Sequence, residues 1–135
     1  MADIGENFRT FVLADASIAA VVGTNMEQNK VDQDTDTPFI YYSRTGESED
    51  MDHAGSGGIS DITFSVQCVD EDINASMSLA ELVRSRLDGF KGTFGTQRVL
   101  GVFVSDRNDD YYQKPDGGDI GFHVAGLSVR ILFAS

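Results

Sequence analysis

Three polar residues at alternate positions are the best candidates in this chain for holding a metal ion. Asp106, Asn108 and Asp110 have the spacing that opens an EF-hand calcium loop. Such a loop also needs a glycine for its sharp turn and a closing bidentate glutamate. Tyr111 and Gly117 occupy those two positions, so the motif fails where the chemistry depends on it. The segment is therefore predicted to be a polar loop.

A second group of metal-ligand types surrounds His53, which lies between Asp50, Asp52 and a glycine-rich stretch. Imidazole and carboxylate suit several divalent ions, but this spacing is not diagnostic of any of them. Cys68 is the only cysteine, so no disulfide can form within the chain. No phosphate-binding loop or nucleophile motif is present. We expect no catalytic residue, no metal and no cofactor, and hence no enzyme.

The charge balance limits the kinds of molecule that can be binding partners. The chain has 135 residues with 22 Asp and Glu against 10 Lys and Arg, a net charge of −12. Nucleic-acid surfaces need clustered Lys and Arg, and anionic membranes attract them too, so the charge argues against both partners. It favours solubility or a basic protein partner. No basic segment precedes an apolar run at the start, so we expect no signal peptide and synthesis in a cytoplasm.

Three segments have the apolar spacing and the end signals of helices. The first begins after Asp3. The second is capped by Asp15 and ends at Gly23, and the third carries an apolar stripe and ends at Gly89. The last two are predicted over Ser17–Val22 and Ile73–Asp88.

Four further segments read as strands. The second of them alternates cleanly, with Ile62, Phe64, Val66 and Cys68 facing a core. One further short strand is possible near Lys30, in the polar segment that precedes the first of these four strands. The predicted fold is a single α+β domain over residues 1–135, with a mainly antiparallel sheet of about four strands and two to three helices on one face. The predicted strands are Pro38–Thr45, Ile59–Val69, Gln97–Ser105 and Ile120–Phe133.

The acidic, glycine-rich stretch Gly46–Gly58 is predicted to be a mobile loop at the tip of a long hairpin. We expect it to contact a neighbouring subunit or another protein. Arginines elsewhere could pair with acidic groups across subunits, and paired tyrosines are typical of interfaces. The interface candidates are Arg44, Glu47, Glu49, Asp50, Asp52, Arg98, Arg107, Tyr111 and Tyr112.

Three segments in order carry a resemblance to a known family. They are LADASIAAVVG over Leu13–Gly23, TPFIYYSR over Thr37–Arg44 and LAELVRSRLDGFKGTFG over Leu79–Gly95. A short helix stopped by glycine, a strand led by proline, and a helix ending in Leu-Asp-Gly-Phe follow one another. From Phe8 to Phe133 the chain resembles the phage tail-completion, or tail-terminator, family of long-tailed phages.

The resemblance implies a structural virion protein that completes the tail tube and joins it to the head connector. It implies a homo-oligomeric ring, commonly a hexamer, in the virion tail or neck after synthesis in the host cytoplasm. The partners implied are further copies, the tail tube protein and the head-completion protein, with DNA passing through the lumen without sequence-specific binding and no membrane involved. From the net charge alone, we expect acidic side chains to face that lumen.

Two alternatives stay open on the sequence. The first is an acidic monomeric module that binds a basic protein partner, which needs no ring. The second is a metal-dependent hydrolase that uses the carboxylates of Asp106–Asp110 or Glu47–His53. Oligomeric state separates the first alternative from a tail-completion ring, and bound metal would support the second.

Overall fold

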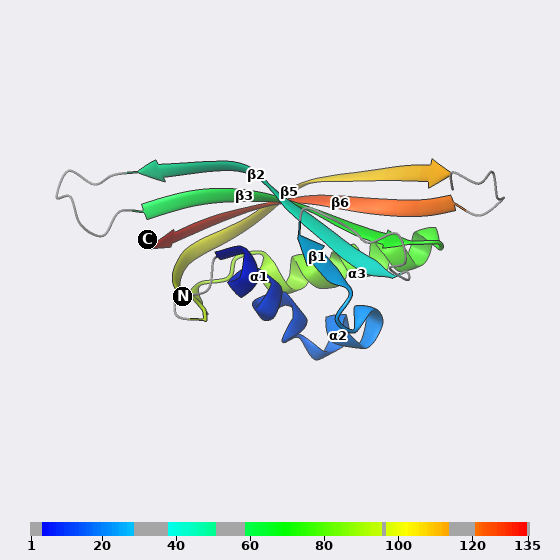
Figure 1. Ribbon diagram of the computed structural model, residues 1–135, viewed down its shortest axis with the longest axis horizontal. Helices are drawn as coiled ribbons and strands as arrows, with labels where there is room; N and C mark the ends of the chain where they lie inside the picture. The colour runs from blue at the N-terminus through cyan, green and yellow to red at the C-terminus, as the bar shows by residue number, and fades with distance from the viewer. Residues whose placement is uncertain (1–3, 29–37, 51–58, 96, 114–120, 135) are drawn as a thin grey trace.

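The computed structural model describes residues 4–28, 38–50, 59–95, 97–113 and 121–134, with the backbone alone at 46–50, 106–107 and 112–113. Three helices lie on one side of a twisted sheet, and two long hairpins extend from it in opposite directions (Figure 1). No helix in these residues is long and apolar enough to cross a membrane. The elements are α1 (Ile4–Leu13), α2 (Ala16–Val22), β1 (Met26–Gln28), β2 (Phe39–Asp50), β3 (Ile59–Asp70), α3 (Ile73–Leu87), β4 (Gly92–Phe94), β5 (Gln97–Gln113) and β6 (Gly121–Ala134).

The α+β class is confirmed, but the sheet differs from the expected one. It has six strands in the order β1-β2-β3-β6-β5-β4, and β1 runs parallel to β2, so the sheet is mixed. The pairing is mainly antiparallel, as expected, but the expected number of about four strands was too low and the parallel pair was not predicted. β1 lies close to the short strand expected near Lys30, and β4 was not predicted; each has three residues. Strands of that length are too short to display an alternating pattern.

Two strands run further than their sequences indicate. β2 continues to Asp50 and β5 to Gln113, so the loops expected from Gly46 and from Asp106 begin later than predicted. A register shift between Arg44 and Gly46, and another between Ser105 and Arg107, breaks each strand's alternation. Such a bulge places an extra residue in one strand while the ladder continues beyond it. The rest of both expected loops, residues 51–58 and 114–120, lies outside the described residues.

The helix ends follow the expected signals closely. Asp15 caps α2 by accepting hydrogen bonds from the backbone N–H of Ser17 at 2.8 Å and of Ile18 at 3.3 Å. This satisfies two donors that have no partner within the helix. α2 begins at Ala16, one residue earlier than predicted. α3 ends at Leu87, and Gly89 follows with a φ of 79°, a conformation that favours glycine.

The core lies between the helices and one face of the sheet. The four β3 residues predicted to face it, Ile62, Phe64, Val66 and Cys68, are all fully buried. Phe8 of α1 stacks on Phe64 with ring centroids 4.9 Å apart. The hydroxyl of Tyr42 donates a buried hydrogen bond of 2.9 Å to the carbonyl of Gly5. These contacts fix α1 on β2 and β3, because a buried tyrosine hydroxyl without a partner would cost stability.

Arg86 joins the ends of two helices. Its guanidinium lies 4.0 Å from the centre of the Phe11 ring, and its Nε and Nη2 each donate to the Phe11 carbonyl at 3.2 Å. That carbonyl belongs to the last turn of α1, where carbonyls lack partners within the helix. One side chain of α3 therefore caps α1 and also stacks on its aromatic surface.

Replacing Arg86 by lysine should lower the free energy of unfolding by about 1–2 kcal/mol, because an ammonium cannot stack flat and donate twice to one carbonyl. Urea unfolding followed by circular dichroism measures the change. Arg84→Lys is the matched control on the same helix, since Arg84 is half exposed and forms an exposed ion pair with Glu81 at 3.5 Å. The control should change stability by less than about 0.5 kcal/mol. Equal losses in the two variants would contradict this role of Arg86.

Candidate assembly surface

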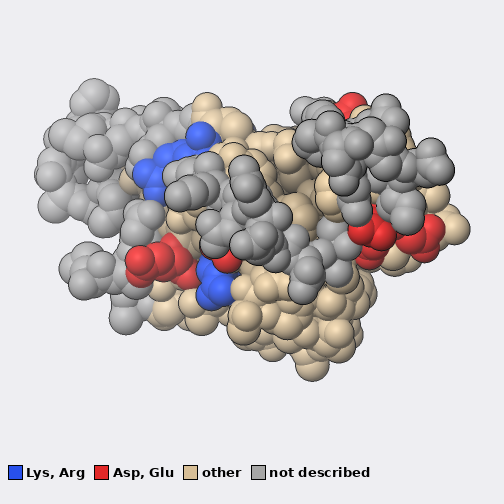
Figure 2. All heavy atoms as spheres, turned by 45° about the vertical axis from the view of Figure 1, so that its right-hand side comes forward, with Lys and Arg blue, Asp and Glu red and all other residues tan. Residues whose placement is uncertain are grey.

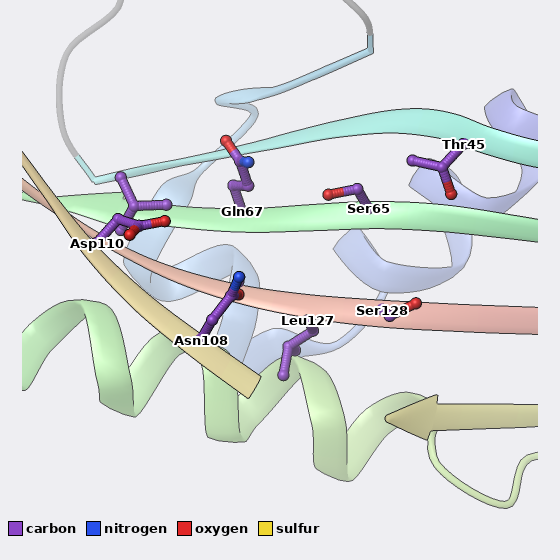
Figure 3. Close-up of a pocket in the computed structure, with 9 residues that line it drawn as sticks. Thr45, Ser65, Gln67, Asn108, Asp110, Leu127 and Ser128 are labelled. Carbon is purple, nitrogen blue, oxygen red and sulfur yellow. The ribbon is translucent and has the colours of Figure 1, made fainter. Parts of the chain in front are cut away.

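The sheet face turned away from the helices is uncovered by the described elements, and it is polar in its middle, with Ile59 and Phe103 exposed nearer one end. Along β3 the residues between the buried ones, Thr63, Ser65 and Gln67, are only partly buried. β-strands place successive side chains on opposite faces, so these residues share the face opposite the core. We call it the open face. In Figure 3 the side chains of Gln67 and Asn108 extend to this side, and Leu127 points toward α3.

A row of serines crosses the open face from strand to strand. Ser43 of β2 lies opposite Ser65 of β3, Ser65 lies opposite Ser128 of β6, and Ser128 lies opposite Ser105 of β5. Directly paired residues in a sheet have side chains on the same face. The row therefore places four hydroxyl groups side by side across the middle of the sheet. Such groups donate and accept hydrogen bonds without carrying charge.

A shallow hollow of about 290 Å³ lies beside this row. A Cβ atom at Gly126 would collide with the amide oxygen of Asn108, so glycine allows Asn108 to fold over β6. Asp110 is the one charged residue in the lining, and most of the others are hydroxyl or amide residues. The hollow can hold water or polar groups of another molecule. Its lining is Thr45, Ser65, Gln67, Asn108, Asp110, Val124, Gly126, Leu127 and Ser128.

One bidentate ion pair lies further along the open face. The guanidinium of Arg130 donates to the carboxylate of Asp61 across β3 and β6, with distances from 2.6 to 3.0 Å. Hydrogen bonding to Asp61, and then its negative charge, raise the pKa of Arg130 above its ordinary value. Neither residue was singled out from the sequence. Their places in the alternating strands were visible, but the cross-strand register that joins them was not.

The acidic candidates from the sequence lie in or beyond a strand. Glu47, Glu49 and Asp50 belong to β2, where their backbones lie opposite Ile62, Ser60 and Ile59. Arg44 precedes the β2 bulge and is exposed. Asp52 and the metal candidate His53 lie outside the described residues. The first five residues of the expected loop, 46–50, thus belong to β2, which pairs with β3.

The remaining candidates all lie on β5. Arg98 is exposed near its start, opposite Thr93 of β4. The backbones of Arg107 and Tyr112 lie opposite Leu127 and Phe122 of β6. The side chain of Tyr111 is 51% exposed, and its ring centre lies 4.8 Å from that of His123. Eight of the nine candidates thus belong to two strands, β2 and β5.

The EF-hand-like residues also lie in β5. Asp106, Asn108 and Asp110 have extended backbones paired or bulged against β6, whereas a calcium loop must wrap around its ion. Over the described residues, no three His, Cys, Asp or Glu side chains are close enough to hold a metal together. On the face seen in Figure 2, the described cationic and acidic side chains form separate small groups.

Comparison with known proteins places the chain among the structural proteins of phage tails. It belongs to the family described as Tail completion protein gp17, whose model matches residues 7–133. A chain in the solved structure titled "Virion of native gene transfer agent (GTA) particle" has the same fold, with a TM-score of 0.63 and 20% identity. The alignment covers 95% of this chain and 92% of that one. No curated protein matches the chain.

The family confirms the resemblance of the three sequence segments. The protein is accordingly a structural component of the virion tail.

Millimolar calcium should not stabilise this protein through the β5 carboxylates, because an extended strand presents alternate side chains to one face and cannot enclose an ion. Thermal unfolding with and without calcium, compared between the native chain and Asp110→Asn, measures this. We expect the same calcium-dependent shift in both proteins. A shift that the Asp110→Asn variant loses would support the metal-binding alternative.

Proposed function

We propose that the protein forms a ring, with six copies as the expected number by family resemblance, that completes the tail tube around the DNA channel. One surface of the ring meets the tail tube protein and the other meets the head connector. The open face of each sheet lines the channel, and the helices form the outside. The observation that carries this orientation is the division of the sheet into a helix-covered face and an open face (Figure 1).

The chemistry of the open face supports a channel through which DNA slides. Proteins that hold DNA neutralise phosphates with clustered Lys and Arg. The residues that line the hollow include neither, and the guanidinium of Arg130 is neutralised by Asp61. The serine row and Asn108 offer short, uncharged groups that keep a water layer. At the hollow, passing phosphates meet no Lys or Arg among the lining residues.

This orientation changes the lumen expected from net charge alone. The hollow contains one carboxylate, Asp110, so its lining is mainly neutral and polar and not strongly acidic. Several described carboxylates lie elsewhere, as at Asp70, Glu71 and Asp72, where β3 passes into α3. The net charge of −12 then acts mainly as a general repulsion of DNA and of premature contacts.

Adding cations to the open face should slow the passage of DNA. We expect Ser65→Lys combined with Ser128→Lys to leave tails assembled and joined, and to slow DNA ejection most at low salt, because lysines bind phosphates with a salt-dependent strength. Ser78→Lys, at an exposed position of α3, is the control and should eject normally. Ejection from purified particles, followed by dye fluorescence over a range of salt, measures the rate. Equal rates in all three particles would contradict the channel-lining orientation.

The ring itself is tested by mass and by imaging. We expect the tip of the joined tail to carry a ring with a central hole wide enough for duplex DNA, in negatively stained particles and by native mass. Isolated protein is measured with and without magnesium, since screening of the charge should favour assembly. A single copy at the tail tip would contradict the ring and favour the acidic binding module for a basic partner.

A further inference from the structure

The two edges of the sheet are only partly covered by the short strands β1 and β4. β1 pairs with β2 from Ile40 to Tyr42, and β4 pairs with β5 from Gln97 to Val99. Both β2 and β5 continue well past these short partners, to Asp50 and Gln113. Long strands at the side of a sheet carry rows of backbone donors and acceptors that can pair with another strand. Which of these groups point outward can be read from the pairing on each strand's other side.

The middle of the β5 edge is closed by the turn after α3. The N–H of Gly89 donates to the carbonyl of Val102 at 2.9 Å, and the N–H of Val104 donates to Asp88 Oδ1 at 3.3 Å. Val102 and Val104 therefore direct their backbone groups outward, away from β6. In antiparallel sheets successive residues direct these groups to alternate sides. The backbone N–H and C=O of Ser105 then point toward β6. In this subsection, a residue is said to face a strand when these two backbone groups point toward that strand.

The far part of β5 follows from the regular alternation of β6. Ser128 pairs with Ser105 and faces β5, so Gly126 and Val124 also face β5. Their partners there are Asn108 and Asp110, which consequently face β6. The bulge after Ser105 has changed which residues point outward. Beyond the bulge, the outward backbone groups on β5 are those of Arg107, Asp109, Tyr111 and Gln113.

At the start of β2, the hydrogen bonds likewise show which backbone groups point outward at the opposite edge of the sheet. The N–H of Ile40 donates to the carbonyl of Asn25 at 2.9 Å, so Ile40 faces outward to the β1 side. Tyr41 then faces β3, and its partner Gln67 faces β2. Every second residue of β3 from Gln67 back to Ile59 therefore faces β2.

The far part of β2 can now be assigned. Asp61 and Ile59 face β2, and their partners are Ser48 and Asp50. The residues between and before these, Glu49 and Glu47, consequently direct their backbone groups outward. No described strand lies on that side of β2 beyond the reach of β1.

The two open edges match each other. One covers residues 45–50 of β2 and the other residues 107–113 of β5. In the order β2-β3-β6-β5 each neighbouring pair is antiparallel, so β2 and β5 run in opposite directions. A copy added head to tail at the side of the sheet would therefore bring its β2 antiparallel to β5 of the first copy. Each chain therefore has both of the edges that are needed to continue the hydrogen-bonded ladder from one copy to the next.

The open edges also lie at opposite ends of the sheet. In Figure 1 the β2–β3 hairpin extends to the left and the β5–β6 hairpin to the right. Copies joined through these edges are displaced along the strands from one to the next. A sheet that closes into a barrel needs such a stagger, because its strands must tilt against the axis.

We propose that residues 107–113 of β5 pair with residues 45–50 of β2 in a second copy of the chain. The inference rests on the ring under Proposed function and gives that ring its interface, a continuous sheet with the open face inward. The contact is heterologous, since different edges meet, and repeated rotation closes it into a ring. Ring closure leaves neither edge open to other chains.

Paired cysteines test the interface in assembled tails. Positions 47 and 109 both direct their backbones outward, and their register partners, Ile62 and Ala125, are buried on the helix-covered face. We expect Glu47→Cys with Asp109→Cys, treated with a short bismaleimide, to give a ladder of denatured oligomers that ends at the ring size. Each single variant should remain monomeric. Native Cys68 is fully buried and stays in place.

The outcomes separate this inference from the ring. Dimers from either single variant would mean that like edges pair, which overturns the proposal. Rings seen by imaging without a ladder from the double variant would overturn the edge contact and leave the ring intact. Absence of both the ring and the ladder would overturn the proposed function, and the edge contact with it.

Proline at an outward position gives a second, independent measurement. Asp109→Pro removes an N–H that the chain's own ladder does not use, so the monomer should keep its circular dichroism spectrum and its thermal midpoint. Rings on tails should be lost. Asp109→Ala keeps the N–H and is the control that should still assemble. Normal rings from a folded Asp109→Pro protein would overturn the proposal.

Discussion

The antiparallel pairing of β3 with β6 is the constraint on which the rest of the molecule depends. It runs without interruption from Ile59 opposite Ala134 to Asp70 opposite His123. Because neither strand has a bulge in this ladder, one set of alternate side chains faces the helices over its whole length. The other set faces away, and in the middle of the ladder it is polar, as at Thr63, Ser65 and Ser128. β2 and β5 are added on either side of this pair, and their bulges adjust only the outer strands.

Much of this fold could be predicted because the signals were local. The alternation around Phe64, the capping carboxylate of Asp15 and the glycine at position 89 depend on neighbouring residues alone. β1 could not be predicted in the same way. Its position depends on Arg9, whose guanidinium donates to the carbonyls of Thr24 and Met26, and on a backbone bond from Ile40. Those contacts join segments that are distant in the chain.

The candidate surface was predicted less well than the fold, for a related reason. Serine, threonine and asparagine have no strong spacing signal, so a row of serines appears only when four strands are placed in register. Charge and aromaticity drew attention instead to β2 and β5. In the proposed edge contact these strands act through their backbones, which carry no residue-specific signal. The family resemblance bridged this gap because it rests on the order of elements and not on any one side chain.

The turn at Asp88 and Gly89 has a consequence for dimensions. By occupying the outward groups of Val102 and Val104, it limits how far a strand added at β5 can slide toward the start of that strand. In a closed sheet the slide between neighbours fixes the strand tilt, and tilt and strand number together fix the diameter. The turn after α3, on the outer layer, would thus help to set the diameter of the channel without contacting anything that passes through it.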